Sequence, residues 1–133
     1  MHTMSKKYRI LIAFLITIIL MVVIGVIVFN KMNEGIEVLI AEELPEIDLT
    51  SIEDGTYLGQ YAIPLISVKV EVTVLDHQIT DIVILEHKNG QGEDGELIID
   101  DVILEQSIEI DYIVGATYSS KAILLAIGDA LKS

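Results

Sequence analysis

The sequence contains no cysteine, and this absence excludes several kinds of site at the outset. Disulfide bonds, thiol redox chemistry, thiolate-ligated iron–sulfur clusters and c-type haem attachment all require that side chain. A lipoprotein anchor is excluded for the same reason. Any redox role must therefore rest on a bound organic cofactor.

Histidine and basic residues are also scarce. The three histidines, His2, His77 and His87, show no metal-ligand spacing, so a solvated or structurally bonded role is favoured for each. All 21 acidic residues follow position 33, and only five lysines lie beyond residue 29, which leaves a charge of about −16 there. This charge argues against nucleic-acid binding and against adsorption to anionic lipid. It favours a solvated surface, with steering towards a basic redox partner or retention of cations as the functional alternative.

One long stretch of the chain carries no charge at all. Residues 10–29 read ILIAFLITIILMVVIGVIVF, and a helix of this length rises about 30 Å, the thickness of the hydrocarbon core of a bilayer. We therefore predict a transmembrane helix at 10–29. Lys6, Lys7 and Arg9 precede it, so the positive-inside rule places residues 1–9 in the cytoplasm and the C-terminal part outside. A cleavable signal peptide is the alternative, but its apolar region would be shorter and would end in small residues.

The rest of the chain divides into an acidic linker at 30–51 and a small domain at 52–133. A helical continuation is expected at 32–43, and Pro45 prevents it from extending past Leu44. Within the domain, strands are predicted at 55–61, 67–75, 79–86 and 108–114, and helices at 96–106 and 119–131. Residues 89–95 are predicted to be a loop.

The strand pattern is clearest at 67–75, where four valines alternate with polar residues as in a half-exposed strand. Asp76 and His77 predict a tight turn, and Ile82–Leu85 is apolar on both faces, which predicts a covered strand. The fold class is therefore α+β: a small antiparallel β-sheet packed with two helices, preceded by one N-terminal transmembrane helix.

The segment 111–123, DYIVGATYSSKAI, is the most informative chemically. A strand ends in a small-residue turn, and hydroxyl residues then open an apolar helix, so Thr117 is expected at a strand-to-helix junction. Backbone N–H groups are unpaired at such a point, which suits a phosphate. The alternative role for Thr117 is a helix N-cap, with its hydroxyl bonded to the N–H of Ser119 or Ser120.

This segment resembles the flavinylation motif of the FMN-binding domain family, which includes the C subunit of the sodium-translocating NADH:quinone reductase. In that family the pattern is roughly Asp-x-x-Ser/Thr-Gly-Ala-Thr, and the last Thr carries FMN through a phosphoester bond. The resemblance extends over about residues 52–132, through the blocks 54–59, 68–74, 76–82 and 85–87. Val114 departs from the pattern, since it stands where the family has Ser or Thr. Tyr61–Leu65 also departs, since larger members have a glycine-rich segment there.

The resemblance implies FMN as the cofactor, attached covalently to Thr117. The implied cofactor-binding residues are Thr117, Ala116, Gly115, Asp111, Ser119, Ser120, Lys121 and Tyr118. Ser119 and Ser120 would bond phosphate oxygens, and Lys121 would be a counter-charge or a solvated surface lysine. Asp111 would be recognised by a flavin transferase that uses FAD.

The aromatic residues offer candidates for contact with the flavin ring. Tyr57, Tyr61 and Tyr118 would stack on it, although tyrosines also pack in cores.

Two functions from different classes follow. The first is a membrane-anchored extracytoplasmic flavoprotein that relays electrons and has no catalytic acid, base or nucleophile set of its own. The alternative is an anchored acidic interaction module that binds FMN non-covalently or not at all. The expected partners are the lipid bilayer, a flavin transferase and a membrane or extracytoplasmic redox partner, and no nucleic acid.

Overall fold

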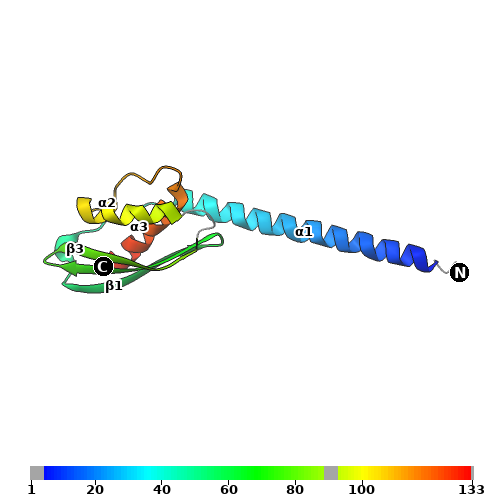
Figure 1. Ribbon diagram of the computed structural model, residues 1–133, viewed down its shortest axis with the longest axis horizontal. Helices are drawn as coiled ribbons and strands as arrows, with labels where there is room; N and C mark the ends of the chain where they lie inside the picture. Colours follow the sequence, from blue (N-terminus) through cyan, green and yellow to red (C-terminus); the bar gives the residue numbers. More distant parts are fainter. Residues whose placement is uncertain (1–4, 89–92, 133) are drawn as a thin grey trace. The chain divides into compact units, whose positions relative to one another are not determined.

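The computed structural model describes residues 5–88 and 93–132 (Figure 1). The first four residues, which include His2, lie outside the described residues, as do residues 89–92 of the predicted loop and Ser133. The chain divides into two units, Met1–Glu34 and Gly35–Ser133, and each is described by itself.

The first unit consists of most of helix α1, which spans Lys6–Ala41 and continues into the second unit. Its apolar side chains are exposed along the stretch predicted to cross the membrane. The hydroxyl of Thr17 donates to the carbonyl of Ala13 at 2.9 Å, so this polar group is satisfied within the helix, as a hydrocarbon environment requires. The helix is long and apolar enough to span a membrane, a property that a signal sequence shares.

The second unit is built on an antiparallel sheet. In the described residues, β1 (Gly55–Ile63), β2 (Ile66–Leu75) and β3 (Gln78–Lys88) form one sheet in the order β1-β2-β3. Asp76 and His77 have φ angles of 50° and 59°, as a type I′ hairpin turn requires. Three of the four predicted strands, and the tight turn, are confirmed.

His77 also ties this turn to the segment that precedes β1. Its Nδ1 lies 3.2 Å from the carbonyl oxygens of both Leu49 and Ile52, next to the short 3-10 helix η1 (Leu49–Ser51). His77 is therefore structurally bonded, one of the two roles predicted for it.

Helix α3 (Thr117–Leu131) covers the inner face of the sheet and contacts β1 and β2 (Figure 1). The four alternating valines of β2 are fully buried, and so are Leu124 and Ile127, as predicted. Gly59 allows the helix to come close, because a Cβ there would lie 2.0 Å from the carbonyl oxygen of Ala126. The core therefore lies between α3 and the inner face of the sheet.

The prediction that residues 82–85 form a covered strand is wrong. β3 is an edge strand, and Val83 and Leu85 on its outer face are 42% and 54% exposed. Both α2 (Ile98–Glu105) and α3 lie on the opposite side of the sheet (Figure 1). An apolar run shows which side chains can be buried, but the cover depends on where other elements pack.

The strand predicted at 108–114 is also wrong, because these residues, all described, are irregular. The side chain of Gln106, just after α2, bonds to β3 instead. Its Oε1 accepts from the N–H of Ile79 at 2.7 Å, and its Nε2 donates to the carbonyl of Ile79 at 2.8 Å. A side-chain amide thus takes the hydrogen bonds that a neighbouring strand would make with β3 at this residue. The helix predicted at 96–106 is confirmed as α2 over Ile98–Glu105. The 3-10 helix η2 (Glu93–Leu97) precedes it, so the loop predicted at 89–95 is wrong for residues 93–95.

The compact unit begins at Gly35, before the predicted domain start. Leu39, near the end of α1, is fully buried, and a Cβ on Gly35 would lie 2.8 Å from the Cδ of Pro64. The last turns of α1 therefore pack as part of the domain. Helix α1 ends at Ala41, and the following residues up to Asp48 are irregular.

Candidate functional site

The exposed turn before α3 has a backbone that only glycine adopts readily. The N–H of Ala116 donates to the carbonyl of Ile113 at 3.0 Å, and Gly115 has a φ of 84°. A positive φ at the third residue is the mark of a type II turn. Val114, the second residue, is 98% exposed, so the turn projects into solvent. A Cβ on Gly115 would meet nothing within 4 Å, so close packing does not require glycine here. The positive φ angle does.

Thr117 is the first residue of α3 and is exposed. The N-cap position belongs to Ala116, and among the described residues no side chain caps this helix. Thr117 is therefore not the N-cap of α3, contrary to the alternative role predicted for it. The first N–H groups of α3 have no acceptor within the helix, and the positive end of the helix dipole lies there.

The two serines that follow Thr117 are both buried. Ser120 is fully buried, and its Oγ accepts from the N–H of Ile113 at 3.1 Å. Ser119 is 3% exposed and lies against η2, where a Cβ on Gly95 would approach its Cβ to 2.8 Å. The structure thus turns both serines towards the protein, whereas it leaves Thr117 facing solvent.

Lys121 lies one helical turn beyond Thr117 and is bonded within the second unit. Its Nζ donates to the carbonyl of Ile40 at 2.7 Å, in the last turn of α1. Carbonyl groups there have no helical partner, and a positive charge is favourable at a helix C-terminus. Lys121 is therefore neither a free counter-charge nor simply a solvated lysine, since it stabilises the end of α1.

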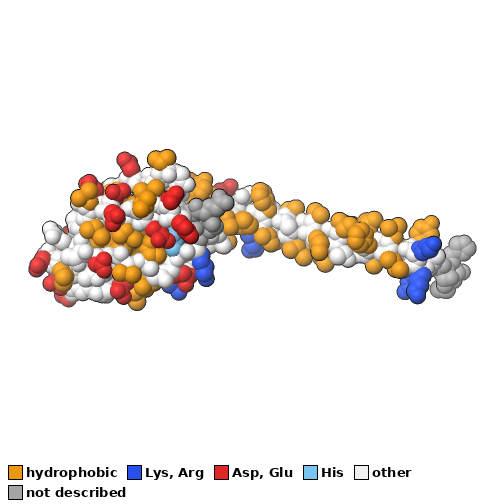
Figure 2. Space-filling model, viewed as in Figure 1, with side chains coloured by type: hydrophobic (Ala, Val, Ile, Leu, Met, Phe, Trp, Pro, Cys, Tyr) orange, Lys and Arg blue, Asp and Glu red, His pale blue; other side chains and the backbone are white. Residues whose placement is uncertain are grey.

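An open cleft of about 780 Å³ lies beside Lys121, and its lining is mostly acidic. Its ten lining residues are Glu42, Glu43, Leu44, Asp101, Glu105, Glu109, Ile110, Asp111, Tyr112 and Lys121. Figure 2 shows that acidic side chains are also spread over the visible face of the second unit. The structure therefore gives Asp111 a place at the wall of a strongly negative cleft. Of the motif residues, Asp111 and Lys121 line this cleft and Thr117 does not.

The four tyrosines of the second unit divide into two groups. The hydroxyl of Tyr57 donates to the carbonyl of Glu53 at 2.7 Å, and that of Tyr61 donates to Glu42 at 3.3 Å. Both rings pack against the core, and burial, together with the Glu42 charge, raises the pKa of Tyr61. Tyr118, next to Thr117, is 46% exposed, and Tyr112 at the cleft is 36% exposed. Tyr112 was not predicted as a site residue, although its position inside the motif could have identified it.

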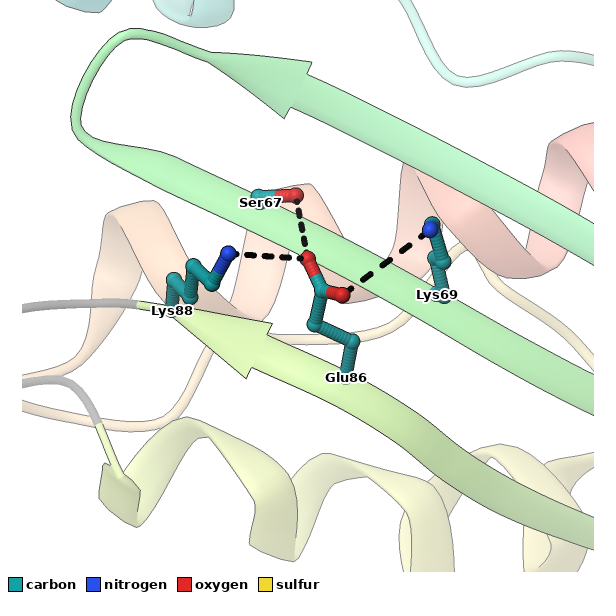
Figure 3. Close-up of polar contacts among 4 residues, drawn as sticks. All are labelled: Ser67, Lys69, Glu86 and Lys88. Carbon is teal, nitrogen blue, oxygen red and sulfur yellow. Dashed lines mark hydrogen bonds and ion pairs between the residues drawn. The ribbon is translucent and has the colours of Figure 1, made fainter.

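A second polar cluster joins β2 to β3 on the sheet (Figure 3). Glu86 accepts from the hydroxyl of Ser67 at 3.2 Å and lies 3.6 Å from Lys88 and 3.8 Å from Lys69. The Lys88 charge, the Ser67 bond and the Lys69 charge together lower the pKa of Glu86. These contacts pair neighbouring strands and need no ligand. Among the described residues, no group of three or more His, Asp or Glu side chains is arranged to hold a metal ion.

The fold and the exposed start of α3 define a small α+β domain that suits a phosphate-bearing cofactor. A model of the FMN-binding domain family matches residues 66–132, just over half of the chain. The chain belongs to the FMN-binding domain family, and FMN is its cofactor. The match runs from β2 to the end of α3 and includes Thr117. No curated protein and no solved structure matches the chain.

Proposed function

We propose that this protein is a membrane-anchored, extracytoplasmic flavoprotein that relays electrons through FMN bound covalently to Thr117. The observation that carries the proposal is the exposed Thr117 at the start of α3, where the first backbone N–H groups lack helical acceptors. A phosphate attached to this side chain would meet those N–H groups and the positive end of the helix dipole.

The attachment step transfers a phosphoryl-linked flavin from FAD. The Thr117 oxygen forms a bond to the phosphorus on the flavin side of the pyrophosphate, and the bond from that phosphorus to the bridging oxygen breaks. AMP leaves with the bridging oxygen, and the threonine hydroxyl loses its proton. A flavin transferase supplies this chemistry, and Asp111, an exposed residue six positions after the end of α2, is the proposed recognition residue.

Bound FMN accepts one or two electrons, and the protein supplies attachment and surroundings. Tyr118 and Tyr112 are the exposed aromatic side chains of the motif, and we propose them for contact with the flavin ring. Tyr57 and Tyr61 are not proposed, because their rings pack in the core and their hydroxyl groups are bonded.

The anchor and its orientation belong to the same proposal. Residues 10–29 of α1 cross the bilayer, with Lys6, Lys7 and Arg9 on the cytoplasmic side. The domain then lies outside the cytoplasm, where no flavin pool replaces a lost cofactor, so a covalent tether is an advantage. The redox partner is a membrane or extracytoplasmic protein.

A second candidate is an anchored acidic interaction module that holds FMN non-covalently or not at all. Val114 favours it, because this side chain occupies the motif position of a Ser or Thr and is 98% exposed. If the transferase requires a hydroxyl there, Thr117 would remain unmodified.

In-gel flavin fluorescence on a denaturing gel tests the proposal. The full chain is co-expressed with an FAD-dependent flavin transferase, together with Thr117→Ala and the control Thr56→Ala, which removes an exposed threonine on β1. We expect fluorescent bands for the wild type and for Thr56→Ala, and a complete loss in Thr117→Ala. A dark wild-type band with flavin released on denaturation would favour non-covalent binding, and a dark band without released flavin would favour the interaction module.

A further inference from the structure

Ser120 holds the exposed turn of the motif against α3. Its side chain is fully buried, and its Oγ accepts a hydrogen bond of 3.1 Å from the N–H of Ile113. Ile113 is also the first residue of the turn, since its carbonyl accepts from the N–H of Ala116 at 3.0 Å. The backbone of Ile113 thus makes two hydrogen bonds: its carbonyl bonds across the turn, and its N–H bonds to α3.

The bond from the N–H of Ile113 to Ser120 takes the place of a bond that the predicted strand at 108–114 would have made to a neighbouring strand. Residues 108–114 are irregular, so the N–H of Ile113 is not part of a sheet ladder. Ile113 packs partly buried against the core, where an N–H without an acceptor costs about 1–3 kcal/mol. Ser120, in the second turn of α3, supplies the acceptor and so fixes where the turn meets the helix.

We infer that Ser120 is a positioning residue for the attachment of FMN to Thr117, an inference that rests on the proposed function. The hydroxyl of Ser120 is directed to Ile113 and is closed to solvent, so it acts on the reaction through the turn. By holding residues 113–116 against the first turn of α3, it presents Thr117 and the exposed Val114 together to the transferase.

Three variants of the full chain in detergent separate this role from simple packing. Ser120→Ala removes the acceptor, and Ser120→Cys keeps the size of the side chain but offers only a weak acceptor. Ser67→Ala is the matched control, because it removes a part-buried serine hydroxyl whose hydrogen bond, to Glu86 at 3.2 Å, lies in the sheet and not in the motif.

Two readouts are needed. The first is the initial rate of flavin attachment with purified transferase and FAD, measured well below the unfolding temperature. The second is hydrogen exchange of the Ile113 amide in the flavin-free protein. We expect attachment to slow about tenfold in both Ser120 variants, the effect of losing one buried hydrogen bond, while Ser67→Ala keeps the wild-type rate. We also expect exchange at Ile113 to accelerate in the Ser120 variants alone.

The outcomes distinguish this inference from the proposed function. A wild type that takes up no covalent flavin overturns the proposed function, and the positioning role with it. A labelled wild type, with both Ser120→Ala and Ser120→Cys attaching flavin at the wild-type rate, overturns the positioning role alone. Slower attachment with unchanged exchange at Ile113 also overturns it, because Ser120 would then act by another route. Wild-type spectra for the flavin once it is attached to the Ser120 variants support positioning, whereas altered spectra would indicate direct contact.

Discussion

The two parts of helix α3 have opposite surroundings. Every residue from Ala122 to Gly128 is buried, whereas Thr117 and Tyr118 in the first turn are exposed. The buried part joins the helix to the sheet, and the exposed part presents the Thr117 side chain beside N–H groups that have no acceptor within the helix. The residues that pack α3 against the sheet and the residues proposed to carry FMN thus lie in separate segments of the helix. Substitutions can therefore change stability and flavin attachment independently.

The largest effect on stability is expected from truncation in the buried part. Leu124→Ala leaves a cavity in the core, and the free energy of unfolding should fall by about 3 kcal/mol. The control is Leu104→Ala on α2, where the side chain is 77% exposed and the change should stay within about 0.5 kcal/mol. Near-ultraviolet circular dichroism of the core tyrosines during denaturant unfolding measures both. Equal losses in the two variants would contradict the packing of α3 on the sheet.

A smaller effect is expected at the turn before the helix. Gly115→Ala places a Cβ at a φ of 84°, which costs about 1 kcal/mol. Because the strain lies in the exposed turn, the free energy of unfolding should fall by about that amount and flavin attachment should slow. Val114→Ala, with an ordinary φ angle, is the control for stability. If Gly115→Ala attached flavin at the wild-type rate, the turn would not need this geometry.

The smallest effect is expected at the far end of α3. Asp129 accepts from Lys132 at 2.6 Å and from the N–H of Gln60 at 3.0 Å. These bonds lower the pKa of Asp129 from the usual 3.8, and the bond from Lys132 is the larger cause. Since the folded-state pKa is depressed, the stabilisation is present above pH 3.8 and is lost as the pH falls through the lower folded-state pKa. Asp129→Asn should therefore cost about 1 kcal/mol at neutral pH.

Denaturant unfolding of the wild type and Asp129→Asn between pH 7 and pH 3 follows this contribution. The difference between the two proteins should shrink as the pH approaches the acid end of this range. A difference that does not vary with pH would mean that the ionised form of Asp129 makes no contribution.

Much of the fold was predictable because the signals are local. Alternating valines fixed β2 and its buried face, Asp76 and His77 fixed the hairpin turn, and the apolar pattern after Thr117 fixed the inward residues of α3. The exposed outer face of β3 was not predictable, because the position of covering helices is a tertiary property. The irregular backbone at 108–114 was not predictable either, and the bonds from Gln106 to Ile79 join residues far apart in the sequence, which no local pattern reports.

The position of the candidate site was predictable, but the direction of its side chains was not. The motif located Thr117 at the start of a helix. Which hydroxyl faces solvent depends on how α3 is rotated against the sheet, and this rotation buries Ser119 and Ser120. Lys121 likewise reaches Ile40, a residue far away in the sequence.

The most direct test of the central claim is peptide mapping by mass spectrometry of the full chain matured with a flavin transferase. We expect one flavin phosphate, located on Thr117 in the exposed first turn of α3. A modification on any other residue, or none on a protein that releases its FMN on denaturation, would contradict the account.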